Sequence, residues 1–510
     1  MSDDPHSQLA ARSLNALSWG ASAAVLRLLL QLGAQIVLAR LLGPQQYGLF
    51  AIGAIVVAFS GFFADIGLAY GLIQKADISD RDLRFVVTWQ WLLGGSVTAG
   101  VYFGAGSLAA FFGEPRATPV LQGLSPLCLL NALAAPSLNL LKRDLDFKRI
   151  QLAQGFSYAL GYWMLGIPLA LMGAQVWALV VAWTVQAALN LGLLYRATGH
   201  PMRPLFWHAQ ARAQWTYGLA VLGSNLVNWV INNIDRVIVG HGFGSRDVGL
   251  YATAGNLLYS PTAAALSVVQ PVFFAASSRV ADDAARIARG YQALLGLVAA
   301  LVLPLALAVA IAAEPLVLLL FGPAWAAVAA ICTPLALAMP LFMLWGVSTP
   351  LLWTAAMPAH EFKLQLPLAL LWAAVCWLAA RESMPAVAWS VLGLSAVRCA
   401  LVVGAAVRLQ RLALADVWAG LSGGVVLSAA VAAAVWLPAL AGRAQLPAWR
   451  CAIVAVTAVA TWAIVVRLWP AALSPVLRVW LGRALLPGPR PIRAALRWLR
   501  IGDPSVTAFP

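Results

Sequence analysis

The sequence predicts an all-α integral membrane protein with about 14 transmembrane helices. Of its 510 residues, 62% are hydrophobic and only 10% are charged, whereas soluble domains carry roughly 25% charged residues. The apolar stretches run about 18–25 residues, which is the length of helix that crosses a hydrocarbon core of roughly 30 Å. A water-soluble chain of this size could not hide so much apolar surface, so the excess must face lipid.

The predicted spans follow one another with short connections. They lie near residues 14–41, 46–66, 85–112, 119–140, 150–172, 174–196, 214–240, 249–275, 291–313, 325–348, 362–380, 384–407, 416–440 and 449–469. The connections leave no room for a soluble catalytic or nucleotide-binding domain, and the phosphate-binding pattern GxxxxGK[ST] is absent from the sequence. We therefore expect neither an enzyme nor a cofactor.

The net charge of +15 would suggest a nucleic-acid partner in a soluble protein, but here membrane topology explains it better. Lys and Arg concentrate on the cytoplasmic side of membrane proteins. With the N-terminus placed inside, 24 of these residues fall in cytoplasmic segments and 7 in outer ones, while Arg27 and Arg398 fall within spans. This asymmetry predicts a membrane protein with both termini in the cytoplasm and no nucleic-acid partner.

An internal repeat divides the chain. Each copy has two glycines five residues apart, and the second glycine is followed by Leu, an aromatic residue and Ala, in residues 43–51 and again in residues 244–252. Each copy joins the first two spans of a group of six. We therefore predict two six-helix bundles at residues 1–200 and 201–411, two extra helices at 412–469 and a basic cytoplasmic tail at 470–510. Paired bundles of this kind favour a transporter that works by alternating access.

Three segments together resemble one family. LARLLGPQQYGLFA at residues 38–51, FADIGLAYGLIQK at 63–75 and LLKRDLDFKR at 140–149 are similar to the polysaccharide-exporter branch of the MOP flippase superfamily. The resemblance implies that the chain flips polyprenyl-diphosphate-linked oligosaccharide from the cytoplasmic to the periplasmic leaflet. Expected partners are this substrate, the membrane lipids, a polysaccharide polymerase and a chain-length regulator.

A flippase for such a substrate needs cations for the diphosphate and hydrogen-bonding groups for the sugars. Arg27 lies near the middle of the first span, where an unpaired Arg costs roughly 2.5–3.5 kcal/mol. Gln31 and Gln35 follow at one-turn intervals and extend the same polar stripe. We interpret this stripe as cavity-lining, with Arg27 as a ligand of phosphate oxygens. The alternative is a structural Arg that pairs with a polar group between helices.

The seventh span carries a matching stripe of Asn225, Asn228, Asn232 and Asp235, with Arg236 beside it. These residues either line the cavity or hold neighbouring helices together. Asp235 and Arg236 could instead pair near the helix end, and Asp235 could carry a coupled proton or cation. Arg398, in the twelfth span, is open to the same two interpretations: lining the cavity or structural pairing.

Two further features have structural interpretations. We expect Asp65 with Gly67 to end the second span at the cytoplasmic face. In the tail, Arg493, Arg497 and Arg500 share a helical face beside apolar residues, which predicts an amphipathic helix on the inner leaflet.

Two other functions compete with the flippase. A MATE-like exporter of small organic cations would need buried acids, whereas the spans offer Arg27 and Arg398 against very few carboxylates. A membrane polymerase or ligase would need a sizeable outer loop with reactive residues, but the outer loops are short. The scattered cysteines and histidines form no metal-binding pattern.

The topology can be tested with reporter fusions. A reporter that fluoresces only in the cytoplasm should be bright when fused near residues 145, 205 and 283 and at the C-terminus. Control fusions near residues 116 and 246 should be dark. A dark C-terminal fusion on a stably expressed protein would contradict an even number of spans.

Overall fold

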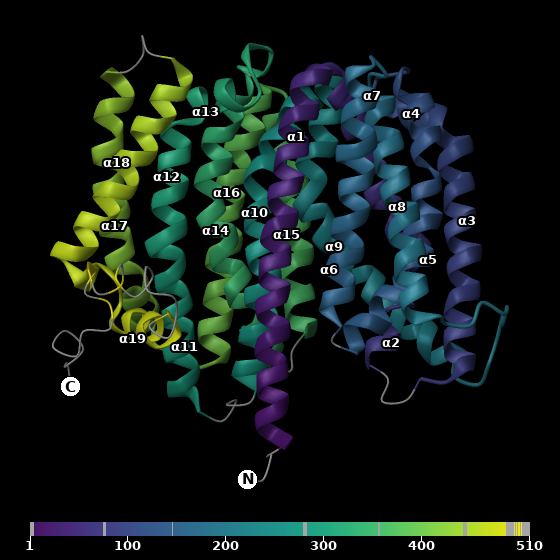
Figure 1. The fold of residues 1–510 in the computed structure, drawn as a ribbon, viewed down its shortest axis with the longest axis horizontal. Coiled ribbons are helices and arrows are strands. Elements are labelled where there is room, and N and C mark those ends of the chain that lie inside the picture. The colour runs from purple at the N-terminus through teal and green to yellow at the C-terminus, as the bar shows by residue number, and fades with distance from the viewer. Residues whose placement is uncertain are drawn as a thin grey trace. The chain divides into compact units, whose positions relative to one another are not determined.

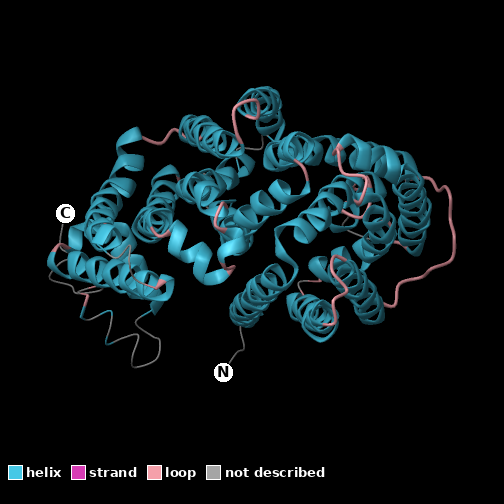
Figure 2. Cartoon of the chain, turned by 90° about the horizontal axis from the view of Figure 1, so that it is seen from above, coloured by secondary structure: helices cyan, strands magenta, loops and turns pink. Residues whose placement is uncertain are grey.

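The structure is a computed structural model that describes residues 5–74, 78–144, 146–278, 283–354, 358–441 and 446–485, together with positions 494, 496, 498, 499 and 501. Across these residues every regular element is a helix (Figure 2). The all-α prediction is thereby confirmed. Arg493, Arg497 and Arg500 of the predicted tail helix lie outside the described residues.

The chain forms two compact units, which we describe separately. Unit 1 comprises Met1–Ala252 and Ala369–Ala380, and unit 2 comprises Thr253–Leu368 and Arg381–Pro510. The bundle boundaries predicted near residues 200 and 411 come from the sequence repeat and do not describe how compactly the chain packs. The predicted bundles therefore stay a prediction.

Figure 1 labels most of the helices. In chain order the α-helices are α1 (Pro5–Asp65), α2 (Gly71–Gln74), α3 (Asp80–Phe111), α4 (Ala117–Leu124), α5 (Pro126–Arg143), α6 (Phe147–Tyr158), α7 (Ile167–Leu171), α8 (Trp177–Thr198), α9 (Ala211–Phe243), α10 (Ser245–Ser278), α11 (Ala284–Leu297), α12 (Leu303–Ile311), α13 (Ala313–Leu320), α14 (Val328–Thr354), α15 (Pro358–Ala379), α16 (Met384–Leu409), α17 (Leu414–Ala441), α18 (Pro447–Leu468) and α19 (Pro475–Leu485). Two π-helical turns, Ala159–Gly166 and Val298–Val302, join α6 to α7 and α11 to α12.

Polar residues begin several of these helices by satisfying amides that have no partner within the helix. Ser79 and Asp82 form a reciprocal capping box at the start of α3. Asp146, Asp283 and Ser383 cap α6, α11 and α16 by accepting a backbone N–H three residues later.

Ten stretches of the described residues are helical, long and apolar enough to cross a membrane. They make the chain a multi-pass membrane protein. The stretch Val25–Asp65 counts as one although the sequence predicts two spans there. Helix α9 has 33 residues but is not among the ten, since its asparagines make it too polar. The exact number of 14 spans therefore stays a prediction.

The repeated glycines adopt the same unusual backbone conformation. Gly43 breaks α1 with φ 73° and ψ 169°, and Gly244 separates α9 from α10 with φ 86° and ψ 178°. This region of backbone space is essentially restricted to glycine. The repeat therefore encodes a break between consecutive helical segments at equivalent positions of its two copies.

The second glycines of the repeat lie against each other. A Cβ atom on Gly48 would lie 1.6 Å from the carbonyl oxygen of Ser245, and one on Gly249 would lie 2.2 Å from the carbonyl oxygen of Pro44. Only glycine permits this backbone-to-backbone approach, as small residues do at other membrane helix interfaces. We call the pair Gly48 and Gly249 the glycine contact.

A hydrogen-bonded carboxylate lies beside the glycine contact. Glu114, in the connection between α3 and α4, accepts two hydrogen bonds from the Arg116 guanidinium, at 2.7 and 2.9 Å, and one from the Ser245 hydroxyl at 2.6 Å. The bonds from Arg116 hold the pKa of the Glu114 carboxyl below its usual range. The stabilisation is therefore complete at neutral pH and is lost as pH falls through the lowered pKa.

The glycine contact can be tested by adding one methyl group. We expect Gly48→Ala to lower the thermal unfolding temperature of the purified protein, since overpacking costs about 1–3 kcal/mol and backbone carbonyls cannot move aside cheaply. Gly106→Ala on α3 is the matched control, because a Cβ there would meet nothing within 4 Å. Equal unfolding temperatures for the two variants would contradict the close approach.

Candidate functional site

Arg27 lies in unit 1 on the part of α1 that precedes the Gly43 break. Its side chain is half-buried, and Nη1 donates a hydrogen bond to Oε1 of Gln154 on α6. Among the described residues Arg27 forms no ion pair. The carboxamide of Gln154 orients the guanidinium but carries no negative charge, so an anionic ligand would find the positive charge uncompensated by that contact.

The rest of the α1 stripe faces the same neighbours. The backbone carbonyl of Gln31 accepts a hydrogen bond from the Tyr158 hydroxyl at 3.5 Å. Nε2 of Gln35 is buried and has no hydrogen-bond partner in the described part of the chain. Buried polar groups are normally hydrogen-bonded, so an unused donor beside Arg27 is consistent with a site that a ligand completes.

Helices α6 and α8 add polar groups that the sequence reasoning missed. Oε1 of Gln151, Oγ of Ser157 and Oδ1 of Asn190 are buried without a partner among the described residues. The Tyr158 and Tyr162 rings stack with centroids 4.5 Å apart and planes inclined by 12°. The spacing of Gln151, Gln154 and Tyr158 by three and four residues places them on one helical face, a signal that could have found them.

The side-chain amides of two α9 asparagines donate hydrogen bonds to backbone carbonyls one turn earlier in the same helix. Nδ2 of Asn228 donates to the carbonyl of Ser224 at 3.2 Å, and Nδ2 of Asn232 donates to the carbonyl of Asn228 at 2.7 Å. Asn225, one turn nearer the start of α9, lines a pocket of about 300 Å³ in unit 1.

Asp235 is buried, with 6% of its surface exposed. Its Oδ2 accepts a hydrogen bond from the Tyr251 hydroxyl at 2.8 Å, while Oδ1 has no partner among the described residues. Arg236, next along the helix, is half-buried. The structure therefore gives Asp235 a neutral hydrogen-bond donor on α10.

Arg398 belongs to unit 2 and is packed on all sides, with 1% of its surface exposed. Its guanidinium carbon lies 3.8 Å from the ring centroid of Trp345, and Nη2 lies 3.4 Å from Oε1 of Gln365. This arrangement is a desolvated cation–π contact, which favours the structural interpretation of Arg398.

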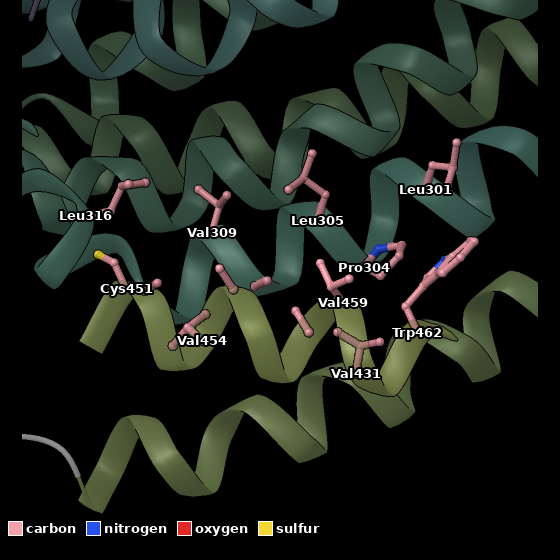
Figure 3. A pocket seen from close by; sticks show the side chains of 14 residues that line it. Leu301, Pro304, Leu305, Val309, Leu316, Val431, Cys451, Val454, Val459 and Trp462 are labelled. Atoms are coloured by element: carbon pink, nitrogen blue, oxygen red, sulfur yellow. The ribbon is translucent and has the colours of Figure 1, made fainter. Parts of the chain in front are cut away.

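Unit 2 also contains an apolar groove between α12 and α18. Its volume is about 540 Å³, and Figure 3 shows Leu305 and Val309 facing Val454 and Val459 across it. Trp462 lines the same groove. A surface of this kind suits a hydrocarbon chain and offers nothing to a charged ligand.

Comparison with known proteins identifies the family. Residues 37–330 match the family described as polysaccharide biosynthesis protein. The chain belongs to this family. The resemblance seen in the sequence is thereby confirmed at the level of the polysaccharide biosynthesis family.

Curated relatives carry related names. The chain is 26% identical over 290 residues to the succinoglycan biosynthesis transport protein ExoT of Rhizobium meliloti, covering 57% of this chain and 58% of the relative. It is 23% identical over 324 residues to the lipopolysaccharide biosynthesis protein WzxC of Escherichia coli, covering 62% and 64%. The chain thus spans about three-fifths of the length of the curated relatives that it matches.

Solved structures show the same fold. The lipid II flippase MurJ in an inward closed conformation superposes with a TM-score of 0.73 at 11% identity, covering 87% of this chain and 97% of that one. An inward-facing multidrug resistance MATE family transporter of the MOP superfamily gives 0.56 at 12% identity, covering 78% and 98%.

The structural role of Arg398 can be tested by a double-mutant cycle. Trp345→Leu and Arg398→Met should each lower the unfolding temperature of the purified protein. Because the two side chains form one contact, the double variant should lose less than the sum of the two, with a coupling on the order of 1–2 kcal/mol. Strictly additive losses would contradict the contact.

Proposed function

We propose that the chain moves polyprenyl-diphosphate-linked oligosaccharide from the cytoplasmic to the outer leaflet of the bacterial inner membrane by alternating access. The observation that carries this proposal is Arg27, a half-buried cation in an apolar stretch of α1. Its hydrogen bond goes to a neutral carboxamide. Membership of the polysaccharide biosynthesis family supports a glycan substrate, and the fold shared with MurJ supports a carrier of this architecture.

The chemistry of the substrate fits the kinds of surface present. A diphosphate in a low-dielectric region needs compensating positive charge, which Arg27 would supply. Sugars need neutral hydrogen-bonding groups, which α6, α8 and α9 offer. The polyprenyl chain needs an apolar surrounding, which the lipid itself supplies while the head group crosses. A polymerase and a chain-length regulator would act on the product in the outer leaflet.

Small organic cations are a poorer fit to these groups. Arg27 would repel them, and the buried carboxylate of Asp235 is hydrogen-bonded by Tyr251. An enzymatic role has no support either, since the groups around Arg27 are an amide, a phenol and backbone carbonyls.

Substitution of Arg27 tests the proposal in an export-deficient strain that is complemented with each variant. Arg27→Lys should retain part of the export, since the charge remains while the bidentate fork is lost. Arg27→Gln should lose most of it, because hydrogen bonding alone leaves the diphosphate under-neutralised. Surface polysaccharide is measured at matched membrane abundance.

Arg408→Gln is the control, because Arg408 is exposed in the last turn of α16 and should export normally. Neither Arg27 variant should reduce membrane insertion, since replacing Arg within a span makes the helix easier to insert. Full export by Arg27→Gln would refute the ligand role. Disappearance of that variant from the membrane would instead indicate a structural one.

A further inference from the structure

Unit 1 contains a polar pocket that the preceding proposal does not use. It has a volume of about 300 Å³ and lies between the last turns of α1 and the first halves of α5 and α9. Its polar lining consists of Asp65, Tyr70, Asn131 and Asn225. Within the span of α9, Asn225 is therefore placed beside polar groups of other helices.

The polar groups of this pocket are reachable from outside the protein. Asn131 is exposed, Asn225 is half-buried, and 43% of the surface of Tyr70 is exposed. The Asp65 carboxylate accepts a hydrogen bond from Nε2 of Gln90, which fixes its orientation. One carboxylate, two carboxamides and a phenol thus offer donors and acceptors together. A nearby cation is Lys142, whose Nζ lies 5.9 Å from the centroid of the Tyr70 ring.

A strained turn holds two of these residues in place. Ile66 and Gly67 both adopt left-handed backbone, with φ 48° and 71°. For a β-branched residue such as Ile66 this conformation is an outlier, with a cost of about 1–3 kcal/mol that tends to occur at functional sites. The turn ends α1 at Asp65, as the sequence predicts, and leads directly to Tyr70.

The turn also fits closely against α9. A Cβ atom on Gly67 would lie 2.9 Å from the Val221 side chain and 3.0 Å from the carbonyl oxygen of Gly218. The approach keeps the Asp65 turn next to the α9 segment that carries Asn225. The two sides of the pocket are therefore held together by close packing of the Gly67 backbone against the α9 backbone and the short Val221 side chain.

A glycine on α1 leaves the pocket open. Gly61 lines it, and a Cβ atom there would meet nothing within 4 Å. Any larger side chain at position 61 would project into this free space. The absence of a side chain is therefore what makes room for a ligand at this point.

We infer that this pocket binds a sugar ring of the lipid-linked oligosaccharide; the inference rests on the proposed function and assigns its glycan recognition to Asp65, Asn131 and Asn225. The volume is at the lower end of the roughly 300–1,000 Å³ that small-molecule sites occupy. Planar amides and a carboxylate match the vicinal hydroxyls of a sugar, and the exposed Tyr70 ring offers an apolar face. We call it the sugar pocket.

Other ligands fit this lining less well. A diphosphate would be repelled by the Asp65 carboxylate, and Lys142, whose ammonium lies 5.9 Å from the centroid of the Tyr70 ring, would offset only part of that repulsion. A bound metal ion needs oxygen ligands that converge at about 2.0–2.6 Å, which is a far smaller cage than this pocket. A hydroxyl-rich neutral group satisfies the amides and the carboxylate at once, which a hydrocarbon chain would leave unpaired.

The experiment compares two lipids on purified protein. One is lipid-linked oligosaccharide extracted from the export-deficient strain, and the other is synthetic undecaprenyl diphosphate without sugar. Binding is followed by tryptophan fluorescence. The wild-type protein should bind the sugar-bearing lipid about tenfold more tightly or better, since a site built to hydrogen-bond hydroxyls discriminates against a ligand that lacks them.

Gly61→Leu should abolish this preference by filling the pocket, while the Kd for undecaprenyl diphosphate stays unchanged. Gly106→Leu is the matched control, since position 106 is exposed on α3 with open space around it.

Asn131→Ala and Asn225→Ala remove hydrogen-bonding groups without adding bulk, and each should reduce the preference about fivefold. These two asparagine variants still test the sugar pocket if the Gly61→Leu protein does not fold. Asn233→Ala controls for the α9 changes, because Asn233 bonds to the Trp229 carbonyl and does not line the pocket.

The outcomes separate the two proposals. Retention of the full preference by Gly61→Leu, or by both asparagine variants, would overturn the sugar pocket while leaving the flippase proposal in place. Failure of the wild-type protein to bind either lipid would overturn both. Arg27→Gln should weaken the binding of both lipids equally, which distinguishes a diphosphate ligand from a sugar ligand.

Discussion

The cost of placing polar groups in a hydrocarbon medium governs this structure. Backbone amides and carbonyls that face lipid must be hydrogen-bonded within the protein, which leaves helices as the form in which this chain crosses the membrane. Side chains obey the same constraint. Arg398 is accommodated by the face of Trp345, and Asp235 by the hydroxyl of Tyr251. Nε2 of Gln35 in unit 1 has no such partner in the part of the chain that the structure describes, and we propose that a ligand completes it.

The glycine contact differs from these side-chain pairs, because two helices pack there through their backbones without any side chain between them. Backbone approaches backbone at Gly48 and Gly249, and the breaks at Gly43 and Gly244 allow the chain to turn there. Glu114 reinforces the contact by binding the hydroxyl of Ser245. An interface of this kind depends on close backbone approach and one hydrogen bond, and no long side chains have to interdigitate.

The sequence predicted the features that depend on pattern along one helix. Hydrophobic length predicts the membrane fold, the repeat predicts equivalent glycines, and Asp65 is placed correctly at the end of α1. Arg27 is identified because a charge in an apolar run is visible without knowing its neighbours. Its placement as a ligand remains a prediction, as do the roles of the α9 asparagines.

Features that depend on contacts between helices were not visible. Gln154 meets Arg27 from a position 127 residues away, and nothing in a single sequence pairs the two. Asp65 was interpreted as a helix end, which it is, but its carboxylate also lines a pocket with Asn131. The strained backbone of Ile66 has no sequence signature, since isoleucine ordinarily avoids positive φ. Pairing and strain are tertiary properties, and they account for most of what reasoning from one chain missed.

The separation of charge from neutral hydrogen-bonding groups has a physical rationale in a transporter. A carrier has to release its cargo, so its affinity is limited, and strong binding in one state would slow the cycle. On our proposal, charge neutralisation at Arg27 would serve the diphosphate, which every lipid-linked glycan of this type shares. Recognition of a particular glycan requires groups whose contribution is modest and directional, and amides with a buttressed carboxylate meet that requirement. Because Gln90 already donates a hydrogen bond to Oδ1 of Asp65, a sugar hydroxyl can donate only to the lone pairs of the carboxylate that remain. Selectivity among glycans can then change through Asn131 and Asn225 while the element that carries the charge stays constant.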